Sequence, residues 1–180
     1  MLAILAATAR PAFTAPAPAK SSAVRPQGAR TTTARPDLSG TWELDVARSD
    51  FGQGTGTEPP KGRTDVIVHR DPELQVTMTV RKSKSEMTTP YTYVTDGASR
   101  VIRLSGQDIH YTAAWSGDTL RVDTRAKILV FEAVVRERWR MAPDRRSLTI
   151  ARHVKSPLGE GDQVLRFRRT SPVQGSVAGE

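Results

Sequence analysis

Apolar and polar residues alternate along most of this chain, and that alternation constrains its fold more than any other feature. The segment 73–82 is the clearest example, because Leu74, Val76, Met78 and Val80 stand at every second position. Successive side chains of a β-strand point to opposite faces, whereas a helix would scatter these four around its axis. The spacing therefore predicts a strand with one buried face and one face in water.

The same period of two recurs from Leu38 onward. It runs through Trp42 and Leu44, Ile109, Tyr111, Ala113 and Trp115, Leu120 and Val122, Leu129 to Met141, Leu148 and Ile150, and Leu165 and Phe167. Turn signals separate these runs at 70–73, 95–97, 105–108, 116–118 and 143–144. Spacings of about 8–14 residues between turns favour hairpins in sequence order over crossovers through helices. The only helical turn that we expect after Pro36 falls in 45–51.

These patterns predict an all-β fold, a single antiparallel up-and-down barrel of about 8–10 strands. A sandwich of two sheets is the alternative, because alternation is the same in both architectures. The chain of 180 residues is long enough for one such domain with a proper core.

The first residues have the character of an export signal. An apolar run at 2–9 is followed by the small-residue triplets Ala15-Pro16-Ala17 and Ala17-Pro18-Ala19, which signal peptidases accept. No basic residue precedes the run, which a truncated start would explain; the alternative is a disordered Ala/Pro-rich tail. We predict a signal peptide at 1–19, a disordered Ala/Pro/Ser/Arg linker at 20–36, the barrel at 37–170 and a disordered tail at 171–180. The protein is then periplasmic or secreted, with a cytoplasmic location as the alternative.

Composition excludes several kinds of chemistry. The chain has no cysteine, and so no disulfide, no thiol nucleophile and no Cys-ligated metal. No apolar run reaches the ~18–20 residues that a membrane-spanning helix needs. The net charge of +8 is uneven, because residues 1–36 carry five basic residues and no acid, while 37–180 carry 22 basic and 19 acidic residues. The barrel is therefore close to balanced, and we expect no nucleic-acid partner.

The segment Leu38-Ser39-Gly40-Thr41-Trp42-Glu43-Leu44-Asp45, followed by Ser49-Asp50-Phe51-Gly52, resembles the opening of the lipocalin-like calycins. It is also similar to a group of exported bacterial lipocalin-like proteins that share this "SGTW-L" and "SDF" opening. In calycins the G-x-W motif starts the first strand, and its Trp plugs the closed end of the barrel beneath an Arg from the last strand. The resemblance therefore implies that Gly40 and Trp42 form this plug with Arg166 or Arg168. It also implies binding of a small apolar or amphipathic molecule, and it brings no catalytic residue to this chain.

Aromatic residues on the alternating faces are the candidate walls of a ligand pocket. They are Tyr91, Tyr93, Tyr111, Trp115, Phe131 and Trp139. Their alternative role is to fill the core. An interior cavity of at least about 300 Å³ would favour ligand binding, whereas a packed interior would favour a structural or interaction module of the cell envelope. Such a module would dock through a sheet edge or through the outward face at Arg136, Arg138 and Arg140.

We find no catalytic or metal-binding motif, and we predict no enzyme, no cofactor and no metal site. His69, His110 and His153 lack metal-ligand spacing, and only His69 could face the interior, as a haem ligand would have to. Glu137 shares the apolar face of Trp139, so a buried carboxylate there would need a partner such as Arg103 or Arg121. A cyclase or isomerase would require such a polar group inside the barrel, which makes Glu137 its one candidate residue.

Overall fold

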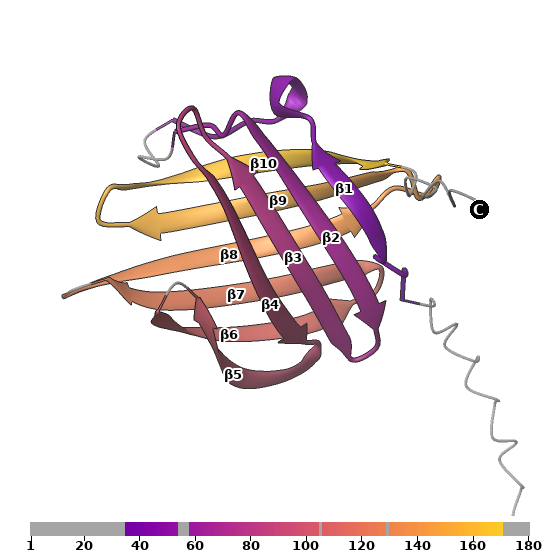
Figure 1. Cartoon of the computed structure of the whole chain (residues 1–180). Coiled ribbons are helices and arrows are strands. Elements are labelled where there is room, and N and C mark those ends of the chain that lie inside the picture. Colours follow the sequence, from indigo (N-terminus) through magenta and orange to yellow (C-terminus); the bar gives the residue numbers. More distant parts are fainter. Residues whose placement is uncertain (1–34, 54–57, 105, 129, 171–180) are drawn as a thin grey trace, which may run out of the picture. The chain divides into compact units, whose positions relative to one another are not determined.

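The computed structural model describes residues 35–53, 58–104, 106–128 and 130–170 (Figure 1). The predicted signal peptide, most of the predicted linker and the C-terminal tail lie outside the described residues. One short 3-10 turn, η1 (Val46–Arg48), lies within the segment predicted to hold a helical turn. The described elements are otherwise β1 (Gly40–Leu44), β2 (Gly62–Arg70), β3 (Glu73–Arg81), β4 (Glu86–Val94), β5 (Asp96–Leu104), β6 (Gln107–Ser116), β7 (Thr119–Ile128), β8 (Phe131–Met141), β9 (Ser147–Ser156) and β10 (Gly159–Thr170).

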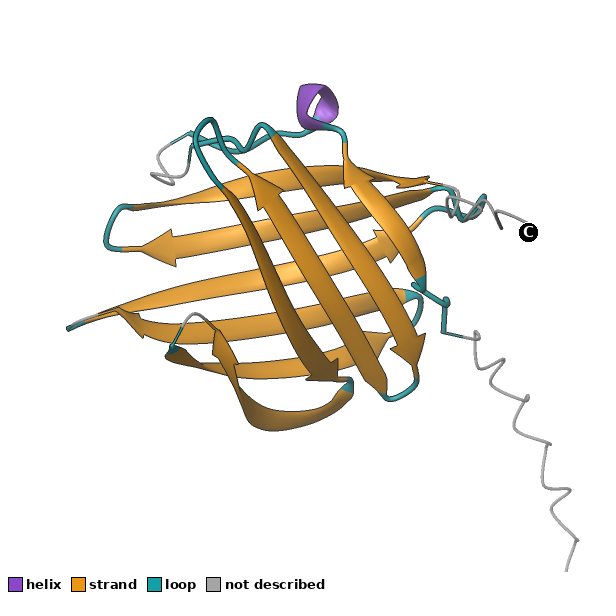
Figure 2. Ribbon diagram, in the orientation of Figure 1, coloured by secondary structure: helices purple, strands orange, loops and turns teal. Residues whose placement is uncertain are grey.

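All ten strands belong to one antiparallel sheet, in the order β4-β3-β2-β1-β10-β9-β8-β7-β6-β5 (Figure 2). Each strand pairs with the next one along the chain except β4 with β5, and β1 pairs with β10, so the first and last strands are neighbours. The sheet therefore curls into a nearly closed up-and-down barrel whose only seam lies between β4 and β5. The predicted barrel is confirmed, and a single continuous sheet excludes the two-sheet sandwich.

Three tyrosines cover the seam near the turn that joins β4 to β5. The rings of Tyr91 and Tyr93 on β4 lie 5.1 Å apart, and the ring of Tyr93 lies 4.9 Å from that of Tyr111 on β6. The Tyr111 hydroxyl also accepts a hydrogen bond from the backbone N–H of Val94 at 3.1 Å. Side chains therefore link β4 to β6 where the backbone ladder is interrupted.

Up-and-down connectivity gives the barrel two distinct ends. At the closed end lie the segment 35–39 and the turns that follow β2, β4, β6 and β8. At the open end lie residues 45–53 and 58–61 and the turns that follow β3 and β9, together with the ends of β5 and β7.

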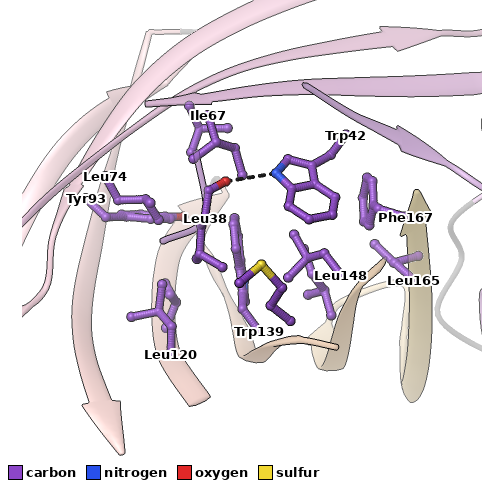
Figure 3. Close-up of a cluster of buried hydrophobic side chains, with 14 of the residues drawn as sticks. Leu38, Trp42, Ile67, Leu74, Tyr93, Leu120, Trp139, Leu148, Leu165 and Phe167 are labelled. Atoms are coloured by element: carbon purple, nitrogen blue, oxygen red, sulfur yellow. Dashed lines mark hydrogen bonds between the residues drawn. The ribbon is translucent and has the colours of Figure 1, made fainter. Parts of the chain in front are cut away.

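The closed end is packed with large apolar side chains, as Figure 3 shows. Leu38, Trp42, Trp139 and Leu148 are almost completely buried there. The indole N–H of Trp42 donates to the carbonyl oxygen of Leu38 at 2.9 Å, the bond drawn in Figure 3, so the polar atom of the plug is satisfied. Trp42 is thus a fully buried member of the core cluster.

The arginine over Trp42 is Arg169, so the prediction of Arg166 or Arg168 is wrong. The guanidinium carbon of Arg169 lies 4.6 Å from the indole centroid. Strand alternation explains the correction, because Phe167 faces the core and its inward neighbour two positions on is Arg169. Arg166 and Arg168 are exposed on the outer face; Arg166 donates to the carbonyl oxygen of Arg48 at 3.1 Å.

Gly40 makes room for that guanidinium. Its φ is +135°, and a Cβ at this position would lie 3.4 Å from Nε of Arg169. Both the backbone conformation and the close approach suit glycine.

Segment 35–39 is fastened across the closed end. Nη1 of Arg35 donates to both carboxylate oxygens of Asp71, at 2.8 and 2.7 Å. The backbone N–H of Leu38 donates to Nδ1 of His69 at 3.3 Å, and the Ser39 hydroxyl accepts from the backbone N–H of His69 at 3.0 Å. These contacts hold the Leu38 side chain in the core.

Candidate ligand-binding site

The open half of the barrel contains a cavity of about 510 Å³. Its apolar walls come from Leu44, Phe51, Pro60, Met78, Val80 and Leu165. Its polar lining consists of Arg63, Arg152 and Gln163, together with Glu58 and Lys82. An apolar enclosure with a few polar groups is typical of sites for small amphipathic molecules.

One of these polar residues, Arg63, comes from β2, where the hydrophobic pattern is inverted. Arg63 and Asp65 point inward together with Ile67, whereas Val66 and Val68 point outward and are 44% and 41% exposed. Hydropathy alone does not reveal Arg63 and Asp65 as interior residues, because the more apolar face of this segment is the outer one. The one indication in the sequence that Arg63 and Asp65 point inward is that they share a strand face with Ile67.

Arg63 and Asp65 form a buried bidentate ion pair. Nε and Nη2 of Arg63 donate to the two carboxylate oxygens of Asp65 at 2.8 and 2.7 Å. The guanidinium also lies 5.3 Å from the ring centroid of Phe167. Burial alone would lower the pKa of Arg63, but the adjacent Asp65 carboxylate reverses that effect and raises it, so the arginine stays charged.

A second buried pair joins β8 to β9. Nε of Arg152 donates to Oε1 of Glu137 at 2.7 Å, and the indole N–H of Trp139 donates to Oε2 at 2.8 Å. Burial raises the pKa of Glu137, but the charge of Arg152 and the Trp139 hydrogen bond outweigh burial and hold this pKa below its ordinary value. Glu137 is therefore a buried, ionised carboxylate.

The partner of Glu137 is thus Arg152, and the prediction of Arg103 or Arg121 is wrong. The strand register explains this, because Glu137 lies directly opposite Arg152 on β9. Arg121 lies opposite Arg138 on the outer face. Arg152 follows Leu148 and Ile150 at the period of two, which was the available signal.

Gln163 adds one more buried polar side chain from β10. Its Nε2 donates to the backbone carbonyl oxygen of Phe51 at 2.9 Å. This bond fastens the segment after β1 to the barrel wall at the edge of the cavity.

None of the six aromatic residues predicted as pocket walls is among the residues that line this cavity. Tyr93, Tyr111 and Trp139 are buried in the core, and Tyr91 is half-buried beside Tyr93. Burial raises the pKa of both Tyr91 and Tyr93, so both hydroxyls stay neutral.

The two other aromatics lie farther from the cavity. Trp115 is half-buried at the closed end, where its ring stacks on that of His69 at 5.7 Å. Phe131 begins β8 at the open end and is 55% exposed. The assignment of all six residues to a ligand site stays a prediction.

The histidines are dispersed. His69 faces the interior, His110 is exposed, and His153 lies on the outer face within 2.9 Å of Asp162. Among the described residues, no three His, Asp or Glu side chains are grouped as metal ligands. Nor does that part of the chain include a helix with the length and hydropathy to cross a bilayer.

The outside of the barrel carries exposed arginines on β7 and β8. Arg121, Arg136 and Arg138 line a hollow of about 620 Å³, and Arg138 and Arg140 line a second one of about 780 Å³. Arg140 lies 3.5 Å from Asp118. These arginines form the outward face identified from the sequence.

No protein-family model and no curated protein matches the chain. Solved structures do. Secretory abundant heat soluble protein 4 from Ramazzottius varieornatus is 13% identical, with a TM-score of 0.53 over 75% of this chain and 96% of that chain. A secretory abundant heat soluble protein of the same organism, from a dimer sample, is 11% identical, with a TM-score of 0.53 over 73% and 94% of the two chains. This likeness shows the fold alone, and it agrees with a calycin-like barrel.

Proposed function

We propose that this protein binds a small hydrophobic or amphipathic molecule, without covalent chemistry, in the cavity at the open end. The observation that carries the proposal is the cavity itself, whose volume exceeds the roughly 300 Å³ expected of a small-molecule site. Its apolar walls would bury the body of the ligand. The fixed arginines in its lining would orient the polar end of that ligand.

We also propose that the protein works outside the cytoplasm, in the periplasm or as a secreted protein. The support is the apolar run at 2–9 with the small-residue triplets after it. Sequencing the N-terminus of the protein from its natural host tests this. Cleavage near residue 19 is the expected result, and an intact Met1 would contradict export.

Binding can be tested with Nile red, an uncharged apolar dye that fluoresces on leaving water. We expect saturable binding by the wild type, and a marked loss in Met78→Trp because the larger side chain occupies the cavity. The control is Thr77→Trp, which adds the same ring to the outer face of the same strand. Thermal unfolding of both variants checks that they are folded.

Two results would count against the proposal. One is the absence of saturable binding by the wild type. The other is a folded Met78→Trp variant that binds the dye as tightly as Thr77→Trp does.

A second candidate function is an interaction module that docks through the outer arginine face. The favouring observation is that Arg121 lies directly opposite Arg138 in the strand register, where like charges oppose folding. An anionic partner would relieve this repulsion. The test is binding to dextran sulfate. Binding by the wild type should weaken as salt is added, and Arg138→Gln should bind more weakly than the wild type at the same salt concentration. Equal binding by wild type and variant would exclude this face.

A further inference from the structure

The two ion pairs of the cavity are arranged so that positive groups face the ligand and negative groups stand behind them. Arg63 and Arg152 line the cavity, while their partners Asp65 and Glu137 do not. The exposed fractions agree, at 8% for Arg63 against 1% for Asp65, and 24% for Arg152 against 7% for Glu137. A ligand therefore meets guanidinium N–H groups first.

The charge of each of these arginines is already balanced within the barrel wall. Asp65 accepts two hydrogen bonds from Arg63, and Glu137 accepts one from Nε of Arg152. The pKa of Glu137 lies below its ordinary value, and that of Arg63 is raised, so both pairs keep their charges near neutral pH. The net charge of these four side chains is therefore zero.

The rim of the cavity is balanced as well. Glu58 and Lys82 are the other charged residues among those that line it, and they carry opposite charges. Taken together, the lining residues and the two carboxylates behind them give three positive and three negative charges. An anionic ligand would therefore give this site a net negative charge and would compete with Asp65 or Glu137 for the arginine that each of them binds. Placing an uncompensated charge away from water is costly.

Hydrogen-bond donors nevertheless remain for a ligand. The bonds and ion-pair contacts to Asp65 and Glu137 use Nε and Nη2 of each arginine, which leaves Nη1 of both. Nη1 carries two N–H groups and no acceptor site. It suits an uncharged oxygen, and it would repel a cation.

From this arrangement we propose that the ligand is an amphipath whose polar end is an uncharged hydrogen-bond acceptor, such as an alcohol, ester or amide. This inference rests on the proposed binding function and concerns the same cavity. Asp65 and Glu137 then act as specificity determinants, because each withholds its arginine from a ligand carboxylate.

Displacement of Nile red by two ligands of equal chain length, decanol and decanoate, tests the proposal. At about pH 8, where decanoate is ionised, we expect decanol to displace the dye from the wild type at a concentration about tenfold lower. Tighter binding of decanoate than of decanol would overturn the inference while supporting the proposed function. Displacement by neither ligand, together with no binding of the dye, would instead reject the proposed function.

Two separate substitutions test the role of the carboxylates. Asp65→Asn frees Arg63, and Glu137→Gln frees Arg152 while keeping an oxygen that can accept from Trp139. Each should strengthen decanoate binding about tenfold and leave decanol binding close to that of the wild type. The matched control is Asp162→Asn, which removes an exposed carboxylate from the outer face. If the folded variants bind decanoate no better than this control does, the carboxylates do not set the specificity.

Discussion

Replacement of Arg152 by Met should leave Glu137 as an unpaired charge inside the barrel. The loss of one partner of a buried ion pair costs about 3–5 kcal/mol. Arg152 is 24% exposed, so water screens part of the interaction, and Trp139 still donates to the carboxylate. We therefore expect the lower end of the range, a loss of about 3 kcal/mol in the free energy of unfolding at neutral pH.

The pH dependence of that loss distinguishes a buried charge from simple loss of packing. In the wild type, the lowered pKa of Glu137 gives stability that is present above the ordinary value of 4.5 and is lost as pH falls through the folded value. In Arg152→Met, the positive charge that offset the effect of burial on Glu137 is gone, so the pKa of Glu137 rises. The variant is then stabilised by protonation, and the difference from the wild type should shrink as pH falls below about 5.

Urea unfolding followed by tryptophan fluorescence, at about pH 7.5 and about pH 4, measures both quantities. The comparison variant is Arg152→Met with Glu137→Gln, which removes both charges and should recover at least about 1 kcal/mol of the loss. A loss below about 1 kcal/mol at neutral pH, or a loss of the same size at both pH values, would refute the assignment of a buried, ionised pair.

Three further predictions concern the closed end, and urea unfolding curves test each of them. Trp42→Ala should cost about 3–5 kcal/mol, because it removes a fully buried ring. Arg169→Ala should cost about 0.5–2 kcal/mol more than Arg168→Ala, because only the first removes a guanidinium from an indole face. Equal losses would show that the contact with the indole adds no stability. Gly40→Ala should cost more than Gly106→Ala, since both have a positive φ but only the first places a Cβ against another side chain.

The strands were predictable because alternation is a local property of the sequence. Segment 73–82 became β3 almost residue for residue. Most turn signals fell at the boundaries between strands, although 95–97 overlaps the start of β5. The order of strands followed from the short turns, since a hairpin leaves a strand little choice of neighbour.

The polar site was much less predictable, for a physical reason. On β2 two valines occupy the outer face, so hydropathy alone selects the wrong side of the strand. The pairing of Glu137 with Arg152 depends on the register between β8 and β9, which the length of the intervening turn sets. The arginine over Trp42 was misassigned because Arg166 and Arg168 lie on the outer face of β10, whereas Arg169 lies on its inner face. Each wrong prediction concerned either which face of a strand is buried or which residues lie opposite each other on neighbouring strands. Local alternation gives neither.

The proposed function divides the interior of the barrel between stability and recognition. At the closed end, Leu38, Trp42 and Trp139 fill the space and supply apolar burial. The ion pairs toward the open end add little net stability, because the cost of desolvating two charges about cancels their attraction. Their physical consequence is different: each carboxylate fixes the position of a guanidinium, so the remaining donors are held in place before a ligand arrives. Donors fixed in this way lose less conformational entropy when they bind. Substitutions at Trp42 should therefore change stability with little effect on ligand choice, whereas substitutions at Asp65 should change ligand choice.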